Sequence, residues 1–78
     1  MMKKLYLIFR HRNGALLAIA ETKKQAKVIQ KDEDESIAKL YGYHNAREAK
    51  QHCGELTHID VWEFDDEIGG YRELQYNG

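Results

Sequence analysis

The sequence predicts an α+β domain of the order ββ-α(α)-ββ, in which two or three short helices pack on one face of a four-stranded, mainly antiparallel sheet. Three observations predict it. Two apolar runs flank Asn13-Gly14, helix-capping residues occur in the middle of the chain, and β-branched and aromatic residues gather near its end. Because 78 residues is the length of one domain, residues 1–78 are expected to form a single unit.

The first expected element is a β-hairpin of residues 5–9 and 15–20. Asn-Gly tolerates the positive φ angles of a two-residue type I′ turn. Such a turn pairs Arg12 with Ala15, Arg10 with Leu17, Phe9 with Ala18 and Ile8 with Ile19. Alternation along the strands then places Tyr6, Ile8, Leu17 and Ile19 on one face, and Leu5, Leu7, Phe9, Leu16, Ala18 and Ala20 on the other. Both faces are apolar, unlike those of a hairpin with one solvated face.

The middle of the chain carries helix signals. Thr22 and Gln25 form a capping box, which predicts a helix that ends near Lys31. The acidic residues 32–35 are expected to interrupt it as a solvated loop, after which Ser36 caps a short second helix.

A further helix is expected after Asn45. Asn45 and Glu48 form a second capping box, and Gly54 is suited to a helix end. Between them, helical spacing places three small residues on one buried face: Ala46, Ala49 and Cys53.

The end of the chain returns to strand. Residues 57–64 are rich in β-branched and aromatic side chains, residues 65–70 have the composition of a turn, and residues 71–76 predict a short final strand. The expected helices are enough to cover one face of the resulting sheet.

The uncovered face gives the main functional hypothesis, a non-enzymatic protein–protein interaction module. The alanines in residues 15–20 favour the approach of a helix on the face that carries Leu5, Leu7 and Phe9. The other face then stays exposed, and exposed apolar patches mark binding sites. A second copy, as in a homodimer, or another protein is expected to cover it. The expected contact residues are Tyr6, Ile8, Leu17, Ile19 and Trp62.

Charge is divided between the two halves of the chain, although the net charge is only −1. The first half predicts an alternative function in nucleic-acid binding, with Tyr6 stacking on a base. Its basic residues are Lys3, Lys4, Arg10, Arg12, Lys23, Lys24, Lys27 and Lys31.

The second half of the chain predicts another alternative, a small acidic inhibitor, of phage or mobile-element type, that occupies the basic groove of a nucleic-acid enzyme. The residues expected to form this acidic face are Asp32, Glu33, Asp34, Glu35, Asp60, Glu63, Asp65, Asp66 and Glu67.

No catalytic, metal or cofactor pattern is found, so neither an enzyme nor a small-molecule substrate is expected. The histidines and Cys53 lack the short, fixed spacings of zinc sites. The acidic run lacks the glycine and glutamate of a calcium-binding loop. A single cysteine without a leader peptide, together with the lack of a long apolar stretch, predicts a cytoplasmic protein that does not enter a membrane.

Overall fold

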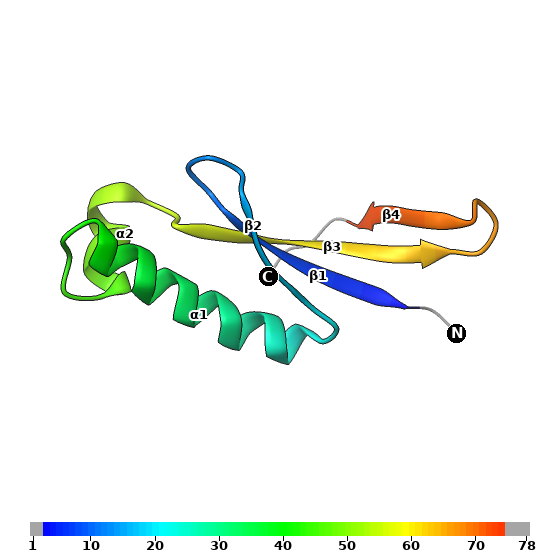
Figure 1. Cartoon of the computed structure of the whole chain (residues 1–78), viewed down its shortest axis with the longest axis horizontal. Coiled ribbons are helices and arrows are strands. Elements are labelled where there is room, and N and C mark those ends of the chain that lie inside the picture. Colours follow the sequence, from blue (N-terminus) through cyan, green and yellow to red (C-terminus); the bar gives the residue numbers. More distant parts are fainter. Residues whose placement is uncertain (1–2, 75–78) are drawn as a thin grey trace.

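The computed structural model describes residues 3–74, which form four strands and two helices (Figure 1). The strands are β1 (Lys4–Arg10), β2 (Leu16–Ala20), β3 (Thr57–Asp65) and β4 (Gly70–Leu74), and the helices are α1 (Lys23–Leu40) and α2 (Ala46–Cys53). The strands form one sheet in the order β2-β1-β3-β4, and all neighbours are antiparallel. The predicted α+β class and the four-stranded sheet are therefore confirmed. The final strand ends at Leu74, and residues 75 and 76 of its predicted range lie outside the described residues.

The first hairpin has a longer loop than predicted. The N–H of Arg10 donates to the carbonyl of Ala15 at 2.8 Å, so residues 11–14 form the loop. Within it, Asn13 Oδ1 accepts from the N–H of Ala15 at 3.0 Å, and Gly14 adopts a φ of 70° that favours glycine.

This loop changes the strand register. The observed pairs are Phe9–Leu16, Ile8–Ala18, Leu7–Ile19 and Tyr6–Ala20. Leu17 has no opposite residue and forms an irregularity of the β-bulge type. The predicted pairs Arg12–Ala15, Arg10–Leu17, Phe9–Ala18 and Ile8–Ile19 are therefore wrong.

Helix α1 begins as predicted but does not break at the acidic run. Its first turn is capped by Thr22, whose Oγ1 accepts from the N–H of Gln25 at 3.1 Å. The helix then continues through residues 32–35 to Leu40. The buried residues Ala26, Asp34, Ile37 and Ala38 keep helical spacing through the acidic run, so one face of a single continuous helix packs on the sheet and on α2.

Asp34 explains how the acidic run is accommodated. Its side chain is buried, accepts a hydrogen bond from the hydroxyl of Thr57 at 2.6 Å, and lies 3.0 Å from Lys50 Nζ. Glu35 Oε1 also accepts from the N–H of Ala46 at 3.3 Å, at the start of α2. The run therefore joins α1 to α2 and β3, and the predicted solvated loop is wrong.

Helix α2 has the predicted boundaries. Asn45 Oδ1 accepts from the N–H of Glu48 at 2.8 Å, and Gly54 ends the helix with a φ of 79°. Ala46 and Ala49 are buried against α1, as predicted, but Cys53 is exposed. Cys53 is the last helical residue, and its thiol contacts the hydroxyl of Tyr43 at the surface, so the prediction of a buried thiol is wrong.

Helix α1 covers the face of β1 that the predicted register left open. Ile8 has no exposed surface and packs in one cluster with Ala20, Ala26 and Ile59. Tyr6 packs against this cluster. The prediction that Tyr6 and Ile8 lie on an uncovered face is therefore wrong.

The physical reason for this inversion is the bulge at Leu17. The alanines of β2 do admit a helix, as predicted, because Ala20 is buried and Ala18 packs against the same cluster. A shift of one residue exchanges the two faces of a strand. The bulge therefore brings Tyr6 and Ile8, instead of Leu7 and Phe9, to the side of these alanines.

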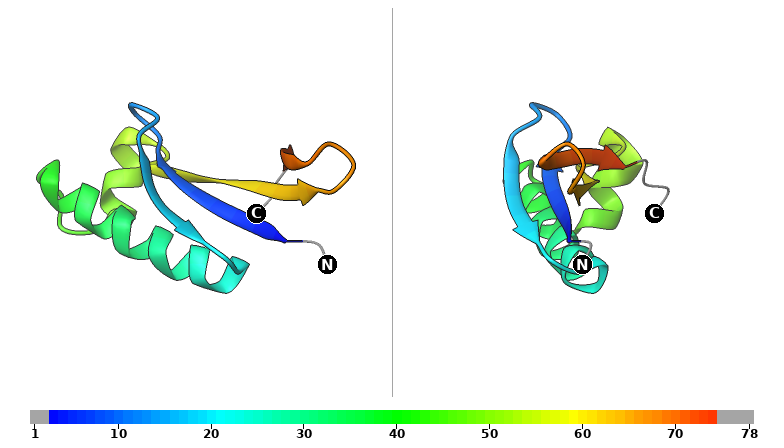
Figure 2. Two further views of the ribbon diagram at one scale, coloured as in Figure 1. Left: turned by 45° about the vertical axis from the view of Figure 1, so that its right-hand side comes forward. Right: turned by 90° about the vertical axis from the view of Figure 1, so that its right-hand side faces the viewer.

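The molecule is elongated, with extents of 47 × 21 × 19 Å and a radius of gyration of 14.1 Å. A compact domain of this length has a radius of gyration of about 11.5 Å. Figures 1 and 2 show the cause: the end of β3 and the whole of β4 extend beyond α1. We call residues 61–74 the arm.

Candidate functional site

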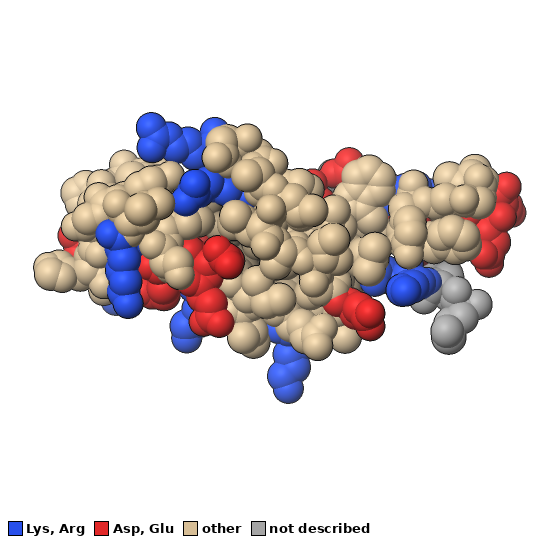
Figure 3. All heavy atoms as spheres, in the orientation of Figure 1, with Lys and Arg blue, Asp and Glu red and all other residues tan. Residues whose placement is uncertain are grey.

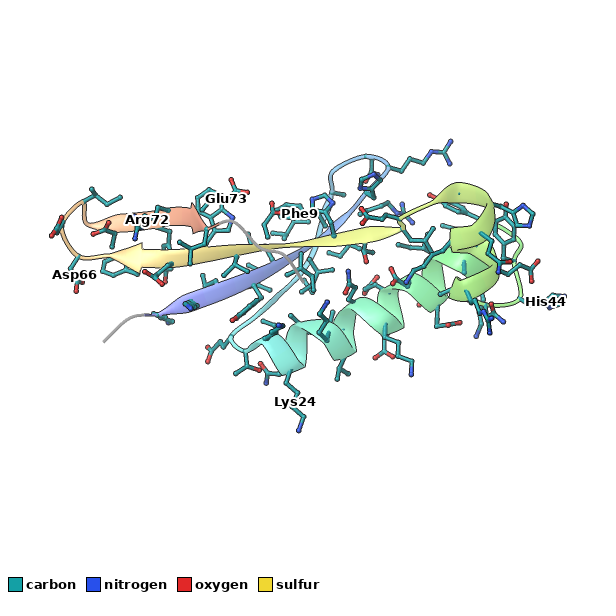
Figure 4. All side chains as sticks on the ribbon, turned by 180° about the vertical axis from the view of Figure 1, so that it is seen from behind. Phe9, Lys24, His44, Asp66, Arg72 and Glu73 are labelled. Atoms are coloured by element: carbon teal, nitrogen blue, oxygen red, sulfur yellow. The ribbon has the colours of Figure 1, made fainter. Side chains whose placement is uncertain are left out.

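The side of the sheet away from α1 carries a continuous set of apolar side chains, which we call the open face. The register places Leu7 between Ile19 and Asp60, and Leu5 beside Trp62. Figure 4 shows Phe9 on this side of the sheet, away from α1. The apolar members of the open face are Leu5, Leu7, Phe9, Leu16, Ile19, Trp62, Phe64 and Tyr71.

Several of these side chains are exposed to solvent. Ile19 is 54% exposed, Leu16 50% and Tyr71 40%, and the other five are half-buried. The ring of Phe64 contacts that of its cross-strand neighbour Tyr71 at a centroid distance of 5.4 Å. The open face is therefore an ordered apolar surface that continues from the body of the domain along the arm.

Two polar side chains lie near the middle of the open face, and Glu73 lies on the same face beside Trp62. The ring of His58 stacks on Phe9 at 5.3 Å, and His58 Nε2 lies 4.0 Å from Asp60 Oδ1. Asp60 keeps 32% of its side chain exposed, in the middle of the sheet. Within residues 3–74, the buried atoms His58 Nδ1 and Trp62 Nε1 have no hydrogen-bond partner.

The structure brings only part of the predicted contact set together. Ile19 and Trp62 lie on the open face, whereas Tyr6 and Ile8 lie on the face under α1. Leu17, at the bulge, packs against both core clusters, so its predicted exposure is also wrong. Four members of the open face were predicted to lie on the covered face: Leu5, Leu7, Phe9 and Leu16. Asn13, whose side chain accepts from the N–H of Ala15, is a signal only for the longer loop and not for the bulge at Leu17 that sets the faces.

The basic residues occupy both sides of the sheet and one helix. Lys3 precedes β1 on the open-face side, whereas Lys4 and Arg10 alternate to the side of α1. Arg12 lies in the hairpin loop, with its guanidinium 5.6 Å from the centroid of the Tyr41 ring. The remaining four are on α1: Lys23, Lys24, Lys27 and Lys31. Figure 3 shows lysine and arginine side chains in separate groups on the visible face.

The acidic residues are likewise divided. Asp34 and Glu63 are buried, so they cannot belong to an exposed acidic face, and that part of the prediction is wrong. Asp32, Glu33 and Glu35 lie on α1, and Asp60 lies on the open face. The other three lie at the tip of the arm, where Asp65 ends β3 and Asp66 and Glu67 begin the turn. The structure does not join these groups into one surface.

A second cluster of titratable side chains lies where the hairpin loop meets the two helices. A cavity of about 530 Å³ there is lined by residues that include His11, Tyr41, Tyr43 and Cys53. The thiol of Cys53 hydrogen-bonds the hydroxyl of Tyr43 at 3.6 Å, and the Tyr43 ring stacks on His52 at 5.4 Å. Among the described residues, no group of three or more His, Cys, Asp or Glu side chains is arranged to hold a metal ion.

The pKa of Tyr43 is raised above its ordinary value of 10.0, first by the hydrogen bond with Cys53, then by burial and by the negative charges of Cys53 and Glu48. We expect Cys53→Ala to lower the pKa of Tyr43 toward 10.0. An alkaline NMR titration that follows the ring signals of Tyr43 measures this pKa. An unchanged pKa in the variant would contradict the role of Cys53 in raising it.

No family model, curated protein or solved structure matches the chain. Within residues 3–74, neither helix has the length and apolar character needed to cross a membrane.

Proposed function

We propose that this chain is a non-enzymatic protein–protein interaction module whose open face is covered by another protein. The supporting observation is the open face itself, an apolar sheet surface on which Leu16 and Ile19 remain about half exposed. Burying a large apolar side chain is worth about 1.5–3 kcal/mol, so covering several of them favours association. Patches of this kind on small domains are typical of binding surfaces.

The charge on the open face favours a different protein over a second copy. Asp60 lies opposite Leu7 near the middle of the face. Two copies stacked face to face around this point bring their Asp60 carboxylates together, and burial of like charges is costly. A partner with an apolar surface and a lysine or arginine opposite Asp60 avoids this cost. A basic rim on the partner would also suit the acidic turn at the tip of the arm.

A site-specific crosslinking experiment tests this proposal. A photoreactive phenylalanine analogue replaces Tyr71 on the open face, or Leu40, which is 69% exposed at the end of α1. We expect irradiation in a lysate of the source cells to give one discrete adduct with another protein from position 71 and none from position 40. An adduct with twice the mass of the chain would instead identify a second copy as the occupant.

Charge reversal makes the test specific to the predicted contact. In the Tyr71-substituted chain, Asp60→Lys should reduce the adduct at least about tenfold, because it places a second cation against the partner's basic group. The matched control Asp32→Lys makes the same charge change on α1 and should leave the adduct unchanged. Equal loss in both variants, or no discrete adduct in any of them, would contradict the proposed function.

A further inference from the structure

The two edges of the sheet differ in how they are protected. The outer strands are β2 and β4. Strand β4 carries Arg72 and Glu73, whereas residues 16–20 of β2 are all apolar and include neither a charge nor a proline. Edge strands normally carry such residues or a bulge, which prevent pairing with another strand. The bulge of β2 lies at Leu17, near its beginning, so the rest of the strand is a regular unprotected edge.

The backbone N–H and C=O groups of Ile19 are free to pair with another strand at the β2 edge of the sheet. At the two ends of β1, the carbonyl of Lys3 accepts from the N–H of Phe64, and the N–H of His11 donates to the carbonyl of Leu56. The odd-numbered residues of β1 therefore bond toward β3. The even-numbered residues of β1 therefore bond toward β2, where Ile8 pairs with Ala18 and Tyr6 with Ala20. Ile19, between these two bonded pairs, directs its N–H and C=O away from the sheet.

An apolar groove lies beside this edge, between β2 and α1. Its volume is about 590 Å³, and its lining includes Ile19, Val28 and Ile29. Val28 is 56% exposed and presents apolar surface beside this edge. The groove therefore extends the apolar edge from the sheet down to the helix.

The charges of α1 are complementary to a second copy of the same helix. Lys24 lies four residues before Val28, and Asp32 lies four residues after it. Both are exposed, and Figure 4 shows Lys24 extending from α1. When two such helices run antiparallel with their Val28 residues opposite each other, each Lys24 faces the Asp32 of the other copy. Two equivalent ion pairs form, and the arrangement is self-complementary.

We propose that two copies of this chain pair through their β2 edges around a two-fold axis at Ile19 and Val28. Ile19 of each copy exchanges two backbone hydrogen bonds with Ile19 of the other, which gives an antiparallel sheet of eight strands. Val28 and Ile29 close the groove beneath the new strand pair. The two open faces become neighbours on one side of the dimer. This interface is formed by the backbone edge of β2 and by α1, whereas the proposed function uses the side chains of the open face. The two share Ile19, but Lys24 and Asp32 belong only to the interface and Asp60 only to the open face, so the two can fail independently.

The mass in solution is the first test. Sedimentation velocity on the full-length chain over a range of concentrations should show a reversible shift from the 9.1 kDa mass of one chain to twice that value. A chain that keeps the mass of the monomer at its highest soluble concentration would overturn the inference.

Charge exchange locates the interface. Lys24→Glu and Asp32→Lys should each weaken dimerisation about tenfold, because each converts two attractive contacts into repulsive ones. The double variant Lys24→Glu/Asp32→Lys restores the attraction with reversed polarity and should dimerise like the wild type. Arg47→Glu, the same charge change on α2, is the control and should have no effect. Normal dimerisation of either single-substitution variant, or weak dimerisation of the double variant, would overturn the two-fold arrangement.

The open-face variant separates this inference from the proposed function. Asp60→Lys should keep the dimer while losing the crosslinked partner, whereas Asp32→Lys should weaken the dimer while keeping the partner. Loss of the dimer in Asp60→Lys alone would place the self-contact on the open face and overturn the β2 pairing. A dimer that needs Lys24 and Asp32, combined with no crosslinked partner, would support the β2 pairing and contradict only the proposed function.

Discussion

Ile8→Asp is expected to unfold the domain. Ile8 is completely buried between α1 and the sheet, so the substitution removes an apolar contact worth about 1.5–3 kcal/mol and places a carboxylate in an apolar cluster. An unpaired charge at such a position costs several kcal/mol more. The total is comparable to the whole stability of a small domain, which is of the order of 5–15 kcal/mol. Far-UV circular dichroism should therefore show loss of the helical signal at room temperature.

The matched control is Ile19→Asp, in the neighbouring strand. Ile19 is 54% exposed and faces the other side of the sheet, so the new carboxylate stays hydrated and the fold should be retained. The two isoleucines thus measure which face α1 covers. If Ile8→Asp folded and Ile19→Asp did not, the assignment of the two faces would be reversed.

Asp34→Ala is expected to cost about 2–4 kcal/mol, because it leaves the buried hydroxyl of Thr57 without its acceptor and removes a charged hydrogen bond. In a domain of this size, a loss of 1 kcal/mol lowers the melting temperature by about 4–8 °C. Thermal denaturation followed by circular dichroism should therefore show a decrease of more than about 10 °C.

Asp34→Asn separates the two contacts of this side chain. The amide oxygen still accepts from Thr57, so this variant loses only the ion pair with Lys50, whose side chain is half exposed. A partly exposed pair of this kind contributes about 1 kcal/mol or less. Asp34→Asn should therefore be clearly more stable than Asp34→Ala. Equal destabilisation by the two substitutions would show that the ion pair with Lys50 in α2, and not the hydrogen bond with Thr57 in β3, supplies the contribution of Asp34 to stability.

The candidate site could be predicted only in part. The sequence indicates that one apolar face of the sheet lacks a helix, and Ile19 and Trp62 are correctly placed on it. The members of this face in β1 are assigned wrongly, because they depend on a bulge at Leu17 that has no strong local signature. The error changes the residues of the proposed contact but not the reason for proposing one.

The sequence alone determined the α+β class, the approximate strand positions and the helix ends at Thr22, Asn45 and Gly54. These features depend on residues close together in the chain, such as a capping side chain and the N–H three positions later. The tertiary structure decided the register of β1 and β2, the covered face of the sheet and the continuity of α1. These depend on distant partners: Ala26 packs against Ile8 and Ile59, and Asp34 meets the hydroxyl of Thr57, 23 residues away. Burial and buried hydrogen bonds act between residues that only the folded chain brings together, so local patterns do not determine them.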